Sequence, residues 1–161
     1  APKHEEVRDL DLTWHFVGHL QSNKALAVAG YSQVIHSVDR PSVVKKLAQV
    51  DHPVEVFIEL NLTDDPGRGG VSEADLPDLI DRVCEVELLR LRGLMAVAPQ
   101  DVEPAVAFEK VVQLQQVVLS REASATDLSM GMSGDFVQAI QAGATHLRIG
   151  TAITGKRPYP A

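Results

Sequence analysis

Residues 128–155 read LSMGMSGDFVQAIQAGATHLRIGTAITG, and this stretch decides how the rest of the chain is interpreted. Two strand-like runs, ATDLSM (125–130) and HLRIGT (146–151), each lead into a turn that contains glycine. The segment between them, SGDFVQAIQAG (133–143), has apolar residues at helical spacing and stops at a glycine. A strand, a helix and a second strand in this order form a βαβ unit, whose two strands lie parallel.

The same alternation of strand-like and helical segments continues along the whole chain. The other predicted strands are LTWHFV (12–17), QVIHSV (33–38), VEVFIELNL (54–62) and LRLRGLMAV (89–97). The other predicted helices are SNKALAVAG (22–30), RPSVVKKLAQV (40–50), SEADLPDLIDRVCEV (72–86) and EPAVAFEKVVQLQQVVLSR (103–121). Repeated βα units predict an α/β fold with a parallel sheet. Periodicity alone leaves two architectures open: an open doubly wound sheet, or an incomplete TIM-type barrel with six of its eight units. No linker interrupts the pattern, so residues 1–161 are interpreted as one domain.

Composition narrows the class of protein. The formal net charge of −7 argues against a surface that binds nucleic acid or an anionic membrane. Cys84 is the only cysteine, which excludes an internal disulfide and favours a reducing, cytoplasmic compartment. No apolar run approaches the roughly 20 residues that a membrane span needs. His15 and His19 have the spacing of a zinc-binding helix, but the motif's glutamate is missing, so no metal site is expected.

Polar residues gather where the predicted strands end. Parallel strands share one carboxyl edge, and α/β proteins bind ligands there. Ser133 stands at the predicted N-cap of the helix after GMSG, where free backbone N–H groups favour an anion. In RIGT, Arg148 adds a positive charge, Gly150 permits close backbone approach and Thr151 adds a hydroxyl. These features predict a phosphate site, with ordinary helix capping as the alternative.

Four motifs resemble the pyridoxal-phosphate homeostasis family, whose barrel is also that of the N-terminal domain of alanine racemase. The motifs are WHFVGHLQSNKA (14–25), GRGGV (67–71), LRGLMAV (91–97) and LSMGMSGDF with AIQAGATHLRIGTAITG (128–155). The resemblance implies the barrel of fold-type III pyridoxal-phosphate enzymes and pyridoxal 5′-phosphate (PLP) as the cofactor. It also implies a carrier that buffers PLP inside the cell and supplies PLP-dependent apo-enzymes, without an established turnover reaction.

The resemblance implies a role for each site residue. Ser133, Gly150 and Thr151 would hold the phosphate, with Met132 close by, and Arg148 would contact the cofactor near its ring nitrogen. An arginine there would keep that nitrogen unprotonated and weaken the ring as an electron sink. The remaining matched positions would line the same face, and they are His15, Asn61 and Met95.

One departure from the family concerns the Schiff-base lysine. The family carries it in a V-[ST]-K segment upstream of W-H-F, and this sequence begins after that point. We therefore expect an N-terminally truncated barrel without a catalytic residue, as a monomer or weak homodimer. Two other functions stay open: a fold-type III amino-acid racemase, and a protein that binds phosphate-bearing metabolites without a covalent bond.

Overall fold

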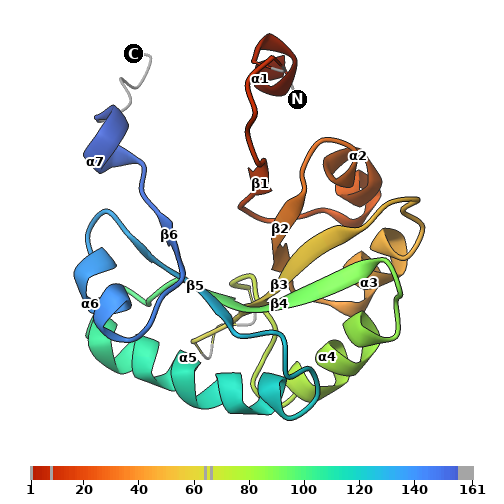
Figure 1. Cartoon of the computed structure of the whole chain (residues 1–161). Coiled ribbons are helices and arrows are strands. Elements are labelled where there is room, and N and C mark those ends of the chain that lie inside the picture. Colours follow the sequence, from red (N-terminus) through yellow and green to blue (C-terminus); the bar gives the residue numbers. More distant parts are fainter. Residues whose placement is uncertain (1, 8, 64, 66, 156–161) are drawn as a thin grey trace.

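The computed structural model describes residues 2–7, 9–63, 65 and 67–155, and within them six parallel strands form one curled sheet (Figure 1). The strands follow the chain order, and each pairs in parallel with the next. They are β1 (His15–Phe16), β2 (Val34–Val38), β3 (Val54–Leu60), β4 (Leu89–Ala96), β5 (Asp127–Met132) and β6 (His146–Arg148). This order and curl are those of an incomplete barrel, which confirms the predicted fold and rules out the doubly wound sheet.

Helices cover the convex side of the sheet (Figure 1). They are α2 (Ala25–Ala29), preceded by the 3₁₀ turn η1 (Ser22–Lys24), α3 (Pro41–Leu47), α4 (Leu76–Cys84), α5 (Pro104–Leu119) and α6 (Phe136–Gln141). Two short helices, α1 (Pro2–Glu6) and α7 (Thr151–Thr154), lie at the ends of the described chain. Pro41 and Pro104 occupy the first turns of α3 and α5, as predicted, because the missing N–H of proline costs nothing there.

The main hydrophobic core lies between these helices and the sheet. Along β3, Val54, Val56 and Ile58 are fully buried in this core, as the two-residue period of a strand requires. The residues between them face the concave side, where a smaller apolar cluster of Val34, Phe57 and Met95 lies apart from the main core. The sheet thus separates an apolar convex layer from a concave face that carries most of the polar side chains discussed below.

Two predicted boundaries near the carboxyl edge are wrong. The helix predicted over residues 133–143 is α6, which begins at Phe136, so Ser133 lies in the turn before it and is not the N-cap. The carboxylate of Asp135 accepts the backbone N–H of Met132 at 2.6 Å, which closes this turn before the helix starts. The last strand ends at Arg148, and Thr151 opens α7 instead of ending the strand. The side-chain bond of Asp135 overrides the apolar pattern in the first place, and the backbone hydrogen bonds of α7 override it in the second.

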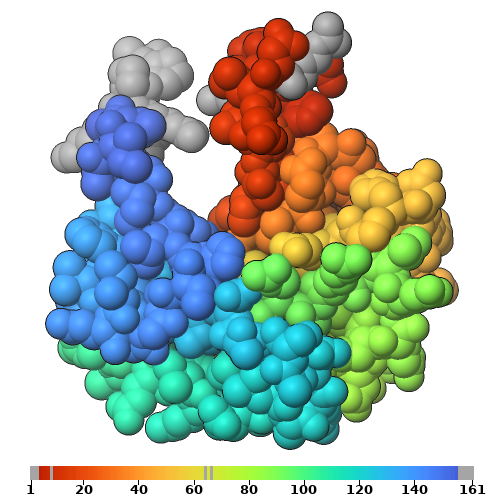
Figure 2. Space-filling view, in the orientation of Figure 1, coloured from red at the N-terminus to blue at the C-terminus, as the bar shows by residue number. Residues whose placement is uncertain are grey.

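The two outer strands, β1 and β6, each have one neighbour among the described residues. The space-filling view shows the molecule hollowed between the red N-terminal part and the blue C-terminal part (Figure 2). Large apolar side chains are exposed near these edges, and they include Val17 on one side and Val137, Ile140 and Leu147 on the other. No helix in the described part of the chain is long and apolar enough to cross a membrane.

Gly93 allows β4 and β5 to approach closely. It adopts a φ of +147° at an irregularity in the pairing of β3 with β4, and a Cβ atom there would overlap the carbonyl group of Asp127. We expect Gly93→Ala to lower the free energy of unfolding by at least ~2 kcal/mol, because the side chain adds strain and overlap at a buried position. Urea unfolding measures this change.

Gly30→Ala is the matched control. Gly30 ends α2 with a φ of −65°, and an added Cβ would make only ordinary contacts of 3.5 Å or more. We expect it to change stability by less than ~1 kcal/mol. If both variants lost the same free energy of unfolding, Gly93 would not make the close contact with Asp127.

Candidate functional site

The concave face brings together polar side chains from five strands. Alternation along each strand points them away from the helices and into the hollow. They are His15 on β1, His36 on β2, Glu59 on β3, Ser129 on β5, and His146 and Arg148 on β6. Their floor is apolar, because the rings of Phe57 and His36 stack with centroids 4.5 Å apart and Met95 is 2% exposed beside them.

A continuous hydrogen-bond chain crosses this face, and we call it the concave chain. It consists of His15, His36, Ser129 and Arg148. His15 Nδ1 lies 2.8 Å from His36 Nε2, and His36 Nδ1 lies 2.8 Å from the hydroxyl of Ser129. Arg148 donates from Nη1 to Ser129 Oγ at 2.8 Å and to the Ser129 carbonyl at 2.7 Å. Its Nη2 donates to the carbonyl of Ala96 at 2.8 Å, so β1, β2, β4, β5 and β6 are all linked.

The ionisation of these groups follows from their burial. Desolvation, reinforced by His15, His146 and Arg148, lowers the pKa of His36 to about 3, so this imidazole is neutral at physiological pH. The pKa of His15 is also lowered, by desolvation and then by His146. Burial lowers the pKa of Arg148 too, but guanidinium keeps its charge in proteins. Arg148 is therefore the fixed positive charge of the concave face.

Glu59 is the acidic group of this face. Desolvation, followed by the nearby charge of Asp39, raises its pKa to about 7, while Arg148 and Arg40 act in the opposite direction. Asp39 itself is held by Arg40, whose Nη1 donates to it at 2.6 Å. The net charge beside Arg148 thus depends on pH close to neutrality.

A second group of atoms, which we call the amide corner, lies where β5 and β6 end. It contains Ser133, Gly134, Gly150 and Thr151. The N–H of Ala152 donates to Ser133 Oγ at 3.2 Å, which brings the two turns together. Within the described residues the N–H groups of Gly134, Gly150 and Thr151 have no protein acceptor. A Cβ atom on Gly134 or Gly150 would meet nothing within 4 Å, so the space beside both glycines is open.

An open cavity of about 720 Å³ joins the concave chain to the amide corner. Its lining runs from His15, Val17 and His36 through His146 and Leu147 to Arg148, Ile149 and Gly150. Free backbone donors at one end and a fixed cation beside them suit an anionic group, and the side chains of Val17, Leu147 and Ile149 suit an apolar one. The predicted site residues His15, Arg148 and Gly150 therefore line a single cavity.

The remaining predicted residues lie at different distances from this cavity. Met132 is 38% exposed at the end of β5, directly before the amide corner, and Met95 lies in the floor. Asn61 is engaged elsewhere: its Nδ2 donates to the carbonyls of Asp65 and Arg68, and its Oδ1 accepts from the N–H and hydroxyl of Thr63. All four of its hydrogen-bonding positions are thus used within the loop after β3.

Sequence reasoning missed His36, Ser129, Glu59 and His146. They lie inside apolar strand-like runs, where a single polar residue looks like part of a core. The alternation along β2, β3, β5 and β6 places them on the same face as His15 and Arg148, and this was the signal that could have found them.

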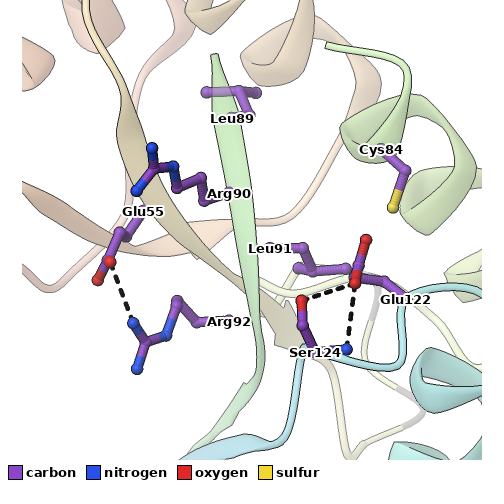
Figure 3. A pocket seen from close by; sticks show the side chains of 8 residues that line it. All are labelled: Glu55, Cys84, Leu89, Arg90, Leu91, Arg92, Glu122 and Ser124. Atoms are coloured by element: carbon purple, nitrogen blue, oxygen red, sulfur yellow. Dashed lines mark hydrogen bonds and ion pairs between the residues drawn. The ribbon is translucent and has the colours of Figure 1, made fainter. Parts of the chain in front are cut away.

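A second cavity, of about 470 Å³, lies at the opposite end of the strands (Figure 3). Figure 3 shows Glu55 between Arg90 and Arg92, with Glu122 and Ser124 bonded to each other nearby. Arg92 is bound to Glu55 at 3.0 Å and to Asp127 at 2.6 Å, so its charge is neutralised by the protein itself. These pairs fasten β3, β4 and β5 together and leave the concave cavity as the better candidate for a ligand.

The four lysines whose side chains are described lie outside the concave face. Lys24 is on η1, Lys45 and Lys46 are on α3, and Lys110 is on α5, and all are exposed. Lys110 pairs with Glu73 at 2.8 Å. Lys156, the last lysine of the sequence, lies outside the described residues.

Comparisons with known proteins agree with this geometry. The family model for the alanine racemase N-terminal domain matches residues 5–158. The pyridoxal phosphate homeostasis protein of Pseudomonas aeruginosa is 39% identical over 163 residues, which cover 99% of this chain and 71% of the relative. The protein of the same name from Escherichia coli is 38% identical over 163 residues, covering 96% of this chain and 69% of the relative.

Solved structures show the same relationship. PipY of Synechococcus elongatus, determined with PLP bound, superimposes with a TM-score of 0.85 at 30% identity, covering 96% of this chain and 76% of PipY. Alanine racemase of Corynebacterium glutamicum superimposes with a TM-score of 0.68 at 15% identity, covering 94% of this chain and 44% of that one, and shares the fold alone. The half-barrel and these matches agree: the chain belongs to the pyridoxal phosphate homeostasis proteins, a family built on the alanine racemase N-terminal domain.

Proposed function

We propose that this protein binds PLP on its concave face and takes part in intracellular vitamin B6 homeostasis. Relatives at 38 and 39% identity are named for that role, and PipY was determined with PLP bound. The racemase alternative has weaker support, because the alanine racemase structure is only 15% identical. Residues 1–161 would form one binding domain, and PLP-dependent apo-enzymes would be the recipients of the cofactor.

The observation that carries the proposal is the amide corner. A phosphate monoester is doubly negative and accepts several hydrogen bonds. The corner offers the N–H groups of Gly134, Gly150 and Thr151, which have no acceptor in the described part of the chain. The hydroxyls of Ser133 and Thr151 add further donors. The space beside both glycines is open, which leaves room for a phosphate next to the two turns.

The rest of the cofactor would lie along the cavity toward the concave chain. Arg148 would donate to the ring nitrogen, and since guanidinium cannot give up a proton there, that nitrogen stays unprotonated. PLP supplies an aldehyde and an electron-withdrawing ring when bound. An unprotonated ring withdraws electrons weakly, which suits a carrier better than a catalyst. His15 and Met132 would border the ring, Met95 would pack behind His36 beneath the surface of the cavity, and Asn61 would shape the neighbouring loop.

Catalysis of racemisation would need acid–base groups on both sides of the ligand. Tyr31, the one tyrosine in the described part of the chain, packs near His4 with ring centroids 6.0 Å apart, away from the cavity. Tyr159 lies outside the described residues. We therefore infer a binding protein, and incubation with L-alanine and PLP followed by chiral analysis should show no D-alanine.

A second candidate function is the binding of phosphate-bearing metabolites in general. The amide corner recognises only the phosphate, so any phosphate monoester would occupy it. What favours PLP is the rest of the cavity, where Val17, Leu147 and Ile149 offer apolar surface beside the ring of His36. Titrations with PLP, pyridoxal and inorganic phosphate separate the two functions. A PLP site should bind PLP more tightly than either pyridoxal or phosphate alone, whereas a general phosphate site should bind inorganic phosphate about as well as PLP.

The amide corner is tested by the double variant Ser133→Ala with Gly150→Val. The valine side chain enters open space, so the ligand-free protein should fold normally while the phosphate site is filled. We expect PLP affinity to fall by about 100-fold or more, because several hydrogen bonds to a charged group are lost together. Calorimetric titration measures the change.

The control for this variant is Ser42→Ala, an exposed serine on α3 on the convex side. It should bind PLP like the unchanged protein. If the double variant also keeps full affinity, the amide corner does not hold the phosphate and the proposal fails.

Glu59 gives a pH-dependent prediction. Below pH 7 its carboxyl is mostly protonated in the folded protein, and above pH 7 it is charged and repels a dianion. Glu59→Gln should therefore bind PLP about fivefold more tightly than the unchanged protein at pH 8, the effect of ~1 kcal/mol of repulsion. At pH 5.5 the two proteins should bind alike. A constant ratio between them at every pH would contradict this role.

Covalent attachment is tested separately. Since the described lysines lie away from the cavity, the 161-residue chain should bind PLP without a covalent bond. Reduction with borohydride followed by peptide mass spectrometry should leave no lysine modified stoichiometrically. One fully modified lysine, for example Lys24, would overturn the expectation, and Lys24→Arg would identify it.

A further inference from the structure

Hydrogen bonds along the concave chain can be donated in one direction or the other, and the fixed donors of the chain decide which. Arg148 has only N–H groups, so it can donate to Ser129 Oγ but never accept. The Ser129 hydroxyl has one hydrogen of its own, and its remaining neighbour in the chain is His36 Nδ1 at 2.8 Å. Ser129 is fully buried and His36 is 2% exposed, so an unused hydrogen there would be costly.

Two directions have to be compared. If His36 carries its hydrogen on Nδ1, Ser129 Oγ receives two donors and its own hydrogen has no acceptor in the chain. If His36 carries its hydrogen on Nε2, Ser129 donates to Nδ1 and His36 donates to His15 Nδ1 at 2.8 Å. Only the second direction gives every hydrogen an acceptor. It also requires that His36 be neutral, which its burial ensures.

We propose that His36 and Ser129 are positioning residues for Arg148, and that donation running from Arg148 through both of them to His15 fixes the guanidinium and leaves His15 with its ring hydrogen on Nε2. His15 then has one polar hydrogen left for a ligand. It lines the same cavity as Arg148 and Gly150, so it favours a ligand that carries an acceptor oxygen at this edge. The expected effect on cofactor affinity rests on the proposed PLP function. The direction of hydrogen-bond donation along the concave chain does not depend on that function.

Burial and His146 lower the pKa of His15 and favour a neutral ring, whereas Glu55 acts in the opposite direction. His36 contacts it from β2, His146 faces it from β6 with ring centroids 5.9 Å apart, and Glu55 acts on it from β3. A doubly protonated His15 would point its Nδ1–H at the Nε2–H of His36, which would break the chain at its open end. The hydrogen bonds of the concave chain can therefore form with only one tautomer of each ring, the one with hydrogen on Nε2.

Nitrogen-15 NMR of the histidine rings reads these tautomers directly. In the ligand-free, ¹⁵N-labelled protein at pH 8, we expect His36 and His15 both to carry hydrogen on Nε2, with Nδ1 unprotonated. Signals are assigned by single histidine variants. Hydrogen on Nδ1 of either ring in the unchanged protein would overturn the proposal.

A variant pair tests the effect on Arg148. Ser129→Ala removes the hydroxyl that connects Arg148 to His36, so both rings should become mixtures of tautomers and PLP affinity should fall about tenfold. Ser129→Thr restores the hydroxyl and should recover single tautomers and most of the affinity. Ser129→Ala with unchanged tautomers and unchanged affinity would contradict the positioning role.

His52→Gln is the matched control, because among the described residues the His52 ring bonds to Asp51 and to the carbonyl of Ala29, away from the concave chain. It should change neither the tautomers of His15 and His36 nor the affinity for PLP. An unchanged protein with the expected tautomers but no affinity for PLP would contradict the proposed function while supporting the direction of the chain. The two failures are thus distinguishable.

Discussion

The fixation of Arg148 is the interaction on which the site depends. A guanidinium that is removed from water needs acceptors, and three oxygens from Ser129 and Ala96 supply them at 2.7–2.8 Å. These bonds tie the short strand β6 to β4 and β5, although β6 has only two register pairs with its neighbour. Gly150 follows Arg148 by two residues, so whatever holds the arginine also sets the position of the amide corner.

The two ends of the sheet use arginine in opposite ways. At the amino end, Arg92 is neutralised by Glu55 and Asp127 and joins three strands. At the carboxyl end, Arg148 is held by uncharged oxygens, and its charge remains available to a ligand. Neutral acceptors fix the geometry of a cation without cancelling its field, which is what a site for a dianion requires.

The parallel sheet was predictable from the alternation of segments, and all six strands lie where apolar runs had indicated them. Local turns were harder, because the apolar pattern around Ser133 and Thr151 does not reveal the Asp135 bond that closes one turn or the helix that follows the other. The motif residues at strand ends were recognisable. The buried His36 and Ser129 were not, since their partners lie 21 and 93 residues away in the sequence and only the curled sheet brings them together.

The parallel order of the sheet also constrains how it can grow. Both outer strands, β1 and β6, run in the same direction as the four between them. A segment that continued this order at either margin would need a crossover of a dozen or more residues, because a tight hairpin reverses the chain. It would then end beside the same rim as Arg148 and Gly150. Any βα addition to this scaffold would therefore bring new side chains to the mouth of the cavity, whichever margin it joined.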